Sequence, residues 1–536
     1  MVTHMDKYEE WNSNFEWDIP EDYTIAKAVD VHAQDRGKIA LYWLNDQGDK
    51  SIIPYWLLRD NANRFANALL DMGVTKGGRI MTVLPRLPEV FYTQIGAFKI
   101  GAIIVPCPEM LREKDIIYRA NNCQAETIVA TPDVVKQIDG VRDQTPLRNF
   151  ILVGGEGNGW QSFDDVVSGA SRNLEPQDVK AEDIMTINYT SGTTGDPKGV
   201  LHDHKWMYCF RKTNAVYWWD AQPDELLWAT TSPGWAKWFW SPLGVAVTVG
   251  ASQLIYQGRF DPPTFLSLME EYRVNKLCAT PTEYRMWAQE DLEAYDLSDM
   301  RKFLSAGEAL NREVIERFKR AYHLQIYDGY GQTETSGLVC NYHGIRIKYG
   351  SMGKPMPGSG VSIVDEDGRK VETGTIGQIA VPIDHPGLMV GYWNGDQLAD
   401  LAANGWYLTG DLAKMDEDGY FWFEGRADDV IKASGYRIGP FEVEDALVKH
   451  PAVMEAAVVA SPHPVRGNIV KAFVVLTKKA RPSEELVKEL QDFVKKETAP
   501  YKYPREIEFV EELPKTISGK IRRVELRERE RQRKDR

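Results

Sequence analysis

From about residue 60 to residue 340, apolar runs of strand length alternate with longer stretches that have helical spacing. Three of these runs are Arg79–Leu84, Thr127–Ala130 and Phe150–Val153, and two of the longer stretches are Tyr55–Met72 and Asn311–Tyr322. Short apolar runs separated by amphipathic helices are typical of largely parallel sheets. This part of the sequence therefore predicts an α/β fold.

The pattern changes near residue 344, where short strands begin to flank Gly-containing turns such as 365–368 and 416–419. Several such turns together predict a small antiparallel β unit over about 344–427. After Asp428, two helical and two strand patterns predict a compact α+β unit, with one helix opening at Ser483. A chain of 536 residues is too long for one core, so we expect an N-terminal domain over 1–427 and a C-terminal domain over 428–536.

Composition excludes several classes of function. The net charge of −14 argues against non-specific binding of nucleic acid, which needs a basic surface. No apolar run approaches the roughly 18 residues of a membrane span, and the acidic start has no signal-peptide pattern. The five scattered cysteines are typical of reduced thiols, or simply of small buried residues. We therefore expect a cytoplasmic protein.

The segment 189–200 combines hydroxyls, glycines and a lysine directly after an apolar run. Glycines let backbone N–H groups approach a ligand, and hydroxyls and a lysine add donors and charge, so we expect a phosphate-binding loop. It is not a Walker A loop, because Lys198 stands between proline and glycine. A flexible surface loop is the alternative when the segment is taken alone. Its candidate residues are Thr190, Ser191, Gly192, Thr193, Thr194, Gly195 and Lys198.

Five further segments follow this loop along the chain: 328–334, 405–411, 425–429, 432–437 and 514–520. In order and spacing, the six segments resemble the adenylate-forming superfamily of acyl-CoA synthetases, luciferases and adenylation domains. The resemblance covers about residues 25–525. Within the superfamily, 330–335 and 499–504 look most similar to the medium-chain AMP-forming acyl-CoA synthetases.

The resemblance implies a two-step reaction. A carboxylate attacks the α-phosphate of MgATP to give an acyl-adenylate and pyrophosphate, and the thiol of coenzyme A then displaces AMP. The partners would be a small carboxylic acid, ATP, coenzyme A and Mg²⁺, with no nucleic acid. Such chemistry needs positioning and charge neutralisation rather than a protein nucleophile.

The resemblance also assigns roles to residues. Thr190, Lys198, Glu334, Arg426 and Lys520 would be catalytic, with Glu334 and Thr190 holding Mg²⁺; a solvated carboxylate is the alternative for Glu334. Asp411 would accept the ribose hydroxyls, and Arg426 would reach the ribose or the α-phosphate. The other nucleotide-binding residues would be Gly307, Glu308, Ala309, Asp328, Gly329, Tyr330, Gly331, Gln332, Thr333 and Arg437.

In the C-terminal unit, Lys520 resembles the lysine that reaches the carboxylate and the α-phosphate during adenylation. Ser434, Gly435 and Tyr436 resemble the loop that lines the path of coenzyme A, although Gly435 is open to interpretation as a turn glycine. Arg466 is a further candidate for a phosphate of coenzyme A, with a solvated arginine as the alternative. Asp428 resembles the hinge around which this unit rotates between the two steps.

Trp235 and Lys237 occupy the segment that borders the acyl pocket in the family. Acetate-specific relatives carry a bulky aromatic where this chain has Gly331, so we expect a pocket for more than two carbons unless Trp235 closes it. The basic tail 520–536 predicts a solvated helix end rather than a nucleic-acid site.

These features predict an AMP-forming acyl-CoA synthetase for a medium-chain, branched or aromatic acid. Two alternatives remain: an enzyme that transfers its acyl group to a carrier protein, and a non-catalytic sensor of nucleotides or acyl groups. A sensor would be expected to lack Lys520, Glu334 or Arg426, and the chain has all three.

Overall fold

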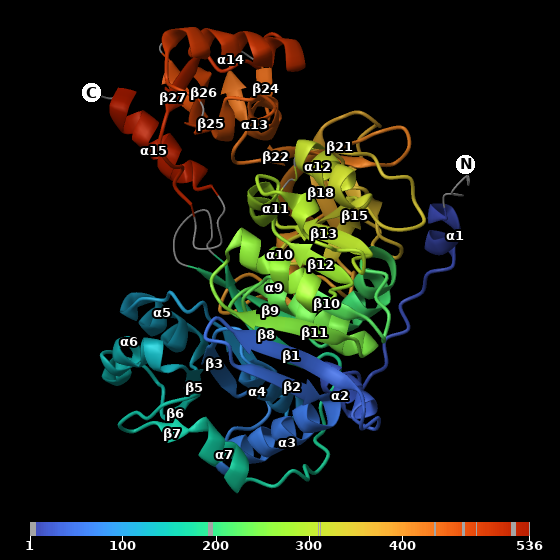
Figure 1. Cartoon of the computed structure of the whole chain (residues 1–536), viewed down its shortest axis with the longest axis vertical. Helices are drawn as coiled ribbons and strands as arrows, with labels where there is room; N and C mark the ends of the chain where they lie inside the picture. Colours follow the sequence, from blue (N-terminus) through green and yellow to red (C-terminus); the bar gives the residue numbers. More distant parts are fainter. Residues whose placement is uncertain are drawn as a thin grey trace.

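The computed structural model describes residues 7–190, 197–308, 310, 312–433, 436–463, 467–478, 480–515 and 521–534, with 432, 436 and 437 described by their backbone alone. Two large sheets form the body of the molecule, and a smaller unit built from the last part of the chain lies at one end (Figure 1). Within these ranges, no helix is long and apolar enough to cross a membrane.

The first sheet has the order β16-β15-β14-β13-β12-β10-β11-β1-β2 in the described part of the chain. Its central strands pair in parallel, whereas β2, β15 and β16 are antiparallel to their neighbours. The strands are β1 (Ile39–Asn45), β2 (Lys50–Pro54), β10 (Leu226–Ala229), β11 (Ser252–Gln257), β12 (Lys276–Ala279), β13 (Lys302–Ala306), β14 (Ile326–Gly331), β15 (Gly337–Cys340) and β16 (Lys354–Pro355).

The second sheet has the order β19-β9-β8-β4-β3-β5-β6-β7 over the same ranges, again parallel except at β9 and β19. The strands are β3 (Arg79–Val83), β4 (Ile103–Pro106), β5 (Thr127–Ala130), β6 (Asn149–Leu152), β7 (Gln161–Ser162), β8 (Ile184–Thr190), β9 (Lys198–Asp203) and β19 (Gly391–Tyr392). The predicted α/β fold with largely parallel sheets is confirmed.

Helices join the two sheets into one core. On α3, buried Leu58, Phe65 and Leu69 share one helical face, and they pack in a cluster with Leu41 of β1 and Ile104 of β4. The helices of the body are α1 (Tyr8–Ser13), α2 (Ile25–His32), α3 (Tyr55–Asp71), α4 (Pro88–Lys99), α5 (Glu113–Cys123), α6 (Val135–Asp139), α7 (Phe163–Gly169), α8 (Lys205–Cys209), α9 (Ala236–Trp238), α10 (Pro262–Glu271), α11 (Pro281–Trp287), α12 (Arg312–Tyr322) and the π-helical η3 (Phe210–Trp218) and η4 (Phe239–Val247).

A third, antiparallel sheet confirms the small β unit. Its hairpin turn at 416–419 joins β21 to β22 as the sequence predicts, and Gly419 there has φ +81°, a conformation that favours glycine. The strands are β17 (Ser362–Val364), β18 (Gly377–Pro382), β20 (Ala402–Ala403), β21 (Trp406–Met415) and β22 (Phe421–Arg426).

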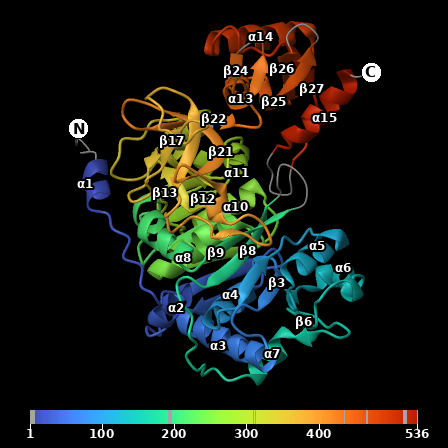
Figure 2. The same ribbon diagram turned by 180° about the vertical axis from the view of Figure 1, so that it is seen from behind.

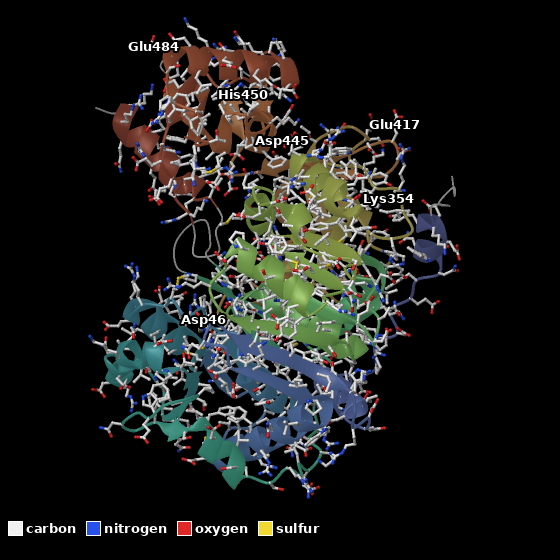
Figure 3. All side chains as sticks on the ribbon, viewed as in Figure 1. Asp46, Lys354, Glu417, Asp445, His450 and Glu484 are labelled. Carbon is white, nitrogen blue, oxygen red and sulfur yellow. The ribbon has the colours of Figure 1, made fainter. Side chains whose placement is uncertain are left out.

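The C-terminal α+β unit follows β22 and lies above the body in both views (Figures 1 and 2). Its elements are β23 (Ile431–Ala433), β24 (Tyr436–Ile438), α13 (Pro440–Val448), β25 (Val453–His463), β26 (Gly467–Leu476), α14 (Glu484–Glu497), β27 (Glu506–Phe509) and α15 (Arg523–Lys534). Helix α14 opens where predicted: the Ser483 Oγ accepts a hydrogen bond from the N–H of Leu486 at 3.1 Å. Glu484 points outward in the first turn (Figure 3). The domain limits at 427/428 stay a prediction.

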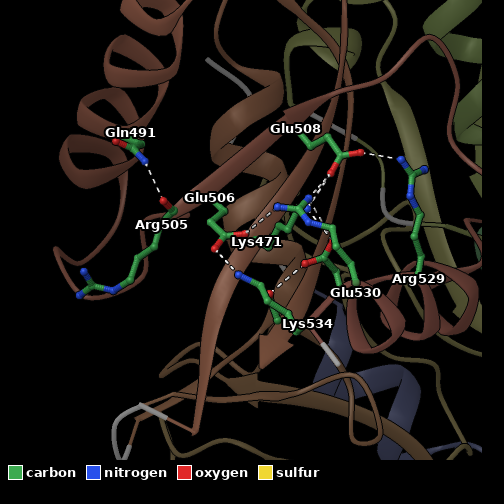
Figure 4. A network of polar contacts seen from close by, with 10 residues as sticks. Lys471, Gln491, Arg505, Glu506, Glu508, Arg529, Glu530 and Lys534 are labelled. Atoms are coloured by element: carbon green, nitrogen blue, oxygen red, sulfur yellow. Dashed lines mark hydrogen bonds and ion pairs between the residues drawn. The ribbon is translucent and has the colours of Figure 1, made fainter. Parts of the chain in front are cut away.

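The basic tail forms a helix that is exposed at 528–529 and 531–534, as expected for a solvated helix end, but one face of it is buried. On α15, Leu526 is buried in a core cluster and Glu530 is fully buried. The Nζ of Lys471, on β26, lies 2.5 Å from the Glu530 carboxylate and 2.6 Å from that of Glu508 (Figure 4). Counting the charges in the sequence does not show that one acidic side chain of this helix faces a buried lysine. α15 is therefore part of the packed C-terminal unit.

Candidate active site

The stems of the expected phosphate loop are the ends of two neighbouring strands. Thr190 ends β8 and Lys198 begins β9, and the two residues are register partners in an antiparallel pair. The Oγ1 of Thr190 donates to the carbonyl oxygen of Lys198 at 3.5 Å. Gly199 is tightly packed, since a Cβ there would lie 2.7 Å from Ile187. Ser191, Gly192, Thr193, Thr194 and Gly195 lie outside the described residues.

Tyr392 connects the loop stem to the expected metal-binding carboxylate. This tyrosine lies on β19, which pairs with β9. Its ring centroid is 4.9 Å from the exposed Lys198 Nζ, and its hydroxyl donates to the Glu334 Oε1 at 3.2 Å. Burial, and then the negative charge of Glu334, raise the pKa of Tyr392. Lys198 and Glu334 are thus close together, although 136 positions (334 − 198) separate them in the sequence.

Three further predicted residues meet around the carboxylate of Asp411. The Tyr330 hydroxyl donates to Asp411 Oδ2 at 2.7 Å, and the Gln332 Nε2 donates to the same oxygen at 2.6 Å. The Arg426 Nη1 lies 3.5 Å from Asp411 Oδ1 across the β21–β22 pair. Burial lowers the pKa of Arg426, but Asp411 and Asp428 outweigh it and the pKa is raised. This cluster offers a fixed carboxylate beside a permanent cation.

Asp328 has a buried side-chain oxygen that can accept a hydrogen bond from a nucleotide base. Its Oδ1 is buried and makes no hydrogen bond within the described residues. Burial raises the pKa of Asp328 to about 8, so the carboxyl is largely protonated near neutral pH in the structure as it stands. On the adjacent strand end, Gly307 has φ +116° and open space beside its Cα. Glu308 forms an ion pair with Arg285 at 2.9 Å, and Ala309 lies outside the described residues.

Thr333 and Gly329 are positioned by aromatic side chains. The Thr333 carbonyl oxygen contacts His202 Nε2 at 2.7 Å, and the imidazole of His202 stacks on Trp206 at 3.7 Å. Burial lowers the pKa of His202 to about 3, which keeps this ring neutral. A Cβ on Gly329 would lie 2.7 Å from the ring of Trp218, so this backbone needs glycine for close approach.

The predicted acyl-pocket residues lie on one short helix and its start. Trp235 is the N-cap of α9 and is half-buried, and the Lys237 Nζ donates to the Ala306 carbonyl oxygen at 3.1 Å. A Cβ on Gly331 would lie 2.3 Å from the Ser336 carbonyl oxygen and 2.4 Å from the ring of Trp240. The space beside Gly331 is therefore taken by backbone and by an indole from another part of the chain, which the sequence pattern did not indicate.

The C-terminal candidates lie partly beyond what the structure describes. Asp428 is exposed two residues after the end of β22, and its carboxylate lies 3.4 Å from Arg426 Nε. Tyr436 and Arg437 lie on β24. Ser434, Gly435, Arg466 and Lys520 are outside the described residues.

Two neighbours of the site escaped sequence reasoning. Tyr392 and Trp240 belong to none of the six motif segments, and nothing local distinguishes them from other aromatic residues. The one signal in the sequence is that Trp240 belongs to a group of seven tryptophans between residues 206 and 240. No group of three or more histidine, cysteine or acidic side chains in the described ranges forms a ready-made metal site. A single carboxylate such as Glu334 suits an ion that takes its other ligands from phosphate and water.

Comparison with known proteins identifies the family of the chain. The family described as AMP-binding enzyme matches residues 29–393, and its C-terminal domain family matches residues 442–520. The chain belongs to the AMP-binding enzyme family.

Its relatives match nearly the whole length of the chain. An acyl–CoA ligase of Bacillus subtilis (strain 168), YtcI, is 44% identical over 96% of this chain and 97% of its own length. The mitochondrial acyl-coenzyme A synthetase ACSM3 of Rattus norvegicus is 40% identical over 98% of this chain and 93% of its own. The crystal structure of the anthranilate CoA ligase AuaEII with anthranoyl-AMP has a TM-score of 0.89 at 30% identity, covering 97% of this chain and 99% of that one.

Proposed function

We propose that this protein is an AMP-forming acyl-CoA synthetase that activates a carboxylic acid with ATP and then forms a thioester with coenzyme A. The observation that carries the proposal is the cluster in which Tyr330, Gln332 and Arg426 surround the Asp411 carboxylate. A carboxylate held in this way can accept hydrogen bonds from vicinal hydroxyls, and the adjacent guanidinium can pair with a phosphate. A ribose 5′-phosphate has both groups.

In the first step, a carboxylate oxygen of the acid attacks the α-phosphorus of ATP, and pyrophosphate leaves with the electron pair of the broken P–O bond. Lys198 would neutralise charge on the leaving phosphates, while Glu334 with Thr190 would hold Mg²⁺, which would supply further positive charge there. Asp328 would accept a hydrogen bond from the exocyclic amino group of adenine, which gives its unsatisfied Oδ1 a partner.

In the second step, the thiol of coenzyme A gives up its proton to solvent as its sulfur attacks the acyl carbon, and AMP leaves with the electrons of the acyl–oxygen bond. Rotation of the C-terminal unit at Asp428 would exchange Lys520 for the 434–436 segment between the steps. The cytoplasmic location also stays a prediction. All five cysteines are buried, and none forms a disulfide bond.

For the acid, we propose a medium-chain, branched or aromatic carboxylate. The printed names of two solved neighbours, the anthranilate ligase and a benzoate CoA ligase from Burkholderia xenovorans LB400 (TM-score 0.83, 29% identity, 94% of this chain and 100% of that one), support an aromatic substrate.

The test is thioester formation with acetate, butyrate, octanoate, 2-methylbutyrate and benzoate, together with acid-dependent release of pyrophosphate from ATP. We expect both products from at least one acid larger than acetate. Pyrophosphate without thioester would favour transfer to a carrier protein. No pyrophosphate with any acid would contradict the proposal and favour a sensor.

A further inference from the structure

The helix after the proposed catalytic lysine is tied to the residue after the proposed hinge. Arg523, at the start of α15, follows Lys520 by three positions in the sequence. Its Nε and Nη2 donate to the two oxygens of Glu444 on α13 at 3.0 Å and 2.6 Å, a forked ion pair. Its Nη1 lies 3.9 Å from the Asp429 carboxylate, which also pairs with Arg527 one turn further along α15.

The carboxylates in this joint are themselves held in place. Glu444 is buried, and its Oε1 also accepts a hydrogen bond from the N–H of Val458 on β25 at 2.8 Å. The side chain of Asp429 is 13% exposed. Burial lowers the pKa of Arg523, but Glu444, Asp429 and the more distant Glu308 outweigh it and raise the pKa.

The residues on the two sides of the proposed hinge, Arg426 and Asp429, form ion pairs with different units. On one side, the Arg426 guanidinium faces Asp411 of β21, and the Ala427 N–H donates to the Gly410 carbonyl oxygen at 2.8 Å. On the other side, Asp429 belongs to the joint with α15. Ala427 and Asp428 between them are exposed. A change of backbone angle at Asp428 therefore moves Asp429 and α15 together relative to β21.

We propose that Arg523, with Asp429, Glu444 and Arg527, is a positioning residue: it makes α15 rotate as one body with the residue after the hinge, so that the adenylating lysine is placed by the rotation. This inference rests on the proposed function. The proposed path of coenzyme A does not depend on this joint. The strands that flank it, β23 and β24, are held by Ile431 and Ile438 in the core of the C-terminal unit. Loosening the joint should therefore affect the first step selectively.

The test separates the two half-reactions. Arg523→Met and the nearly isosteric Asp429→Asn should lower pyrophosphate formation between about 10-fold and 100-fold, the loss that a misplacement of about 1 Å can cause. Thioester formation from synthetic acyl-adenylate should stay within about twofold of wild type, since the joint is not needed there. Arg522→Met is the matched control, because Arg522 is exposed, lies just before α15, and within the described residues its side chain forms an ion pair with Glu525 of that helix and none with the joint.

A measurement without catalysis tests the same joint. All five native cysteines are buried, so spin labels on cysteines placed at Val524 of α15 and Met454 of β25, both exposed, should attach selectively. The distance distribution between the labels should broaden with Asp429→Asn and not with Arg522→Met. An unchanged distribution, or equal losses in both half-reactions, would overturn the inference. If the wild-type chain makes no adenylate from any acid, the proposed function fails, and the distance distribution alone decides on the joint.

Discussion

Replacing Asp411 by asparagine tests the nucleotide site at its centre. In the structure, Asp411 Oδ2 already accepts from the Tyr330 hydroxyl and the Gln332 amide, while Oδ1 lies 3.5 Å from Arg426. Asparagine has a single side-chain oxygen. We expect this oxygen to keep the hydrogen bonds from Tyr330 and Gln332, so that the NH₂ group faces Arg426 and the ribose. The variant keeps the size of the side chain but removes the acceptor that two ribose hydroxyls would use.

A hydrogen bond to a charged group contributes about 1.5–3 kcal/mol, so the loss of one should raise the KM for ATP about 10-fold to 150-fold. The assay is pyrophosphate release at saturating acid, with ATP and 2′-deoxy-ATP compared in the same experiment. Wild type should bind 2′-deoxy-ATP more weakly than ATP, whereas Asp411→Asn should hardly distinguish them. Asp418→Asn, an exposed carboxylate on the hairpin after β21, is the control.

Equal penalties for 2′-deoxy-ATP in Asp411→Asn and in wild type would refute the reasoning, because the carboxylate would then not contact the ribose. A lower midpoint of urea unfolding in the variant would show instead that the cluster mainly stabilises the β unit.

Three other changes have distinct expected outcomes. Trp235→Gly should shift preference toward longer or bulkier acids by about fourfold in affinity per added methylene (about 0.8 kcal/mol), and an unchanged acid profile would place Trp235 outside the pocket. Lys520→Ala should slow adenylate formation by about 10²–10³-fold and spare thiolysis of synthetic acyl-adenylate, whereas Gly435→Leu should do the reverse; equal losses in both steps would contradict the rotation. Burial lowers the pKa of Lys302 from 10.5 to about 7, so the unfolded chain binds more protons between these values and stability rises with pH. Lys302→Met should remove this rise, at most about 3 kcal/mol between pH 7 and pH 9.5 in urea unfolding, and parallel curves for the two proteins would contradict it.

The arrangement of α15 shows why some features escaped sequence reasoning. The charges of the tail were visible, and a solvated helix was the expected outcome. In the structure, Glu530 faces the buried Lys471 of β26, and Arg523 faces Glu444 of α13. A count of charges cannot tell which of them face a sheet, because this depends on how the helix packs across strands that lie more than 50 positions away in the sequence.

The sequence by itself determined the class of fold and predicted a set of candidate site residues. Runs such as Thr127–Ala130 and helices such as Tyr55–Asp71 follow from local periodicity, and the Gly-containing turn at 416–419 follows from residue type. These signals are readable because each depends on neighbours only a few positions apart. The resemblance then added roles for residues within the six motifs.

The tertiary structure alone decided which of these residues meet. Asp411 contacts Tyr330 because β21 and β14 belong to different sheets that pack together, and Tyr392 reaches Glu334 because β19 adds to β9. Trp240 occupies the space beside Gly331 for the same reason. Side-chain contacts between distant segments depend on strand order and packing, which local periodicity does not encode. The sequence thus predicted which residue types the site would use, and the fold determined how their side chains are arranged.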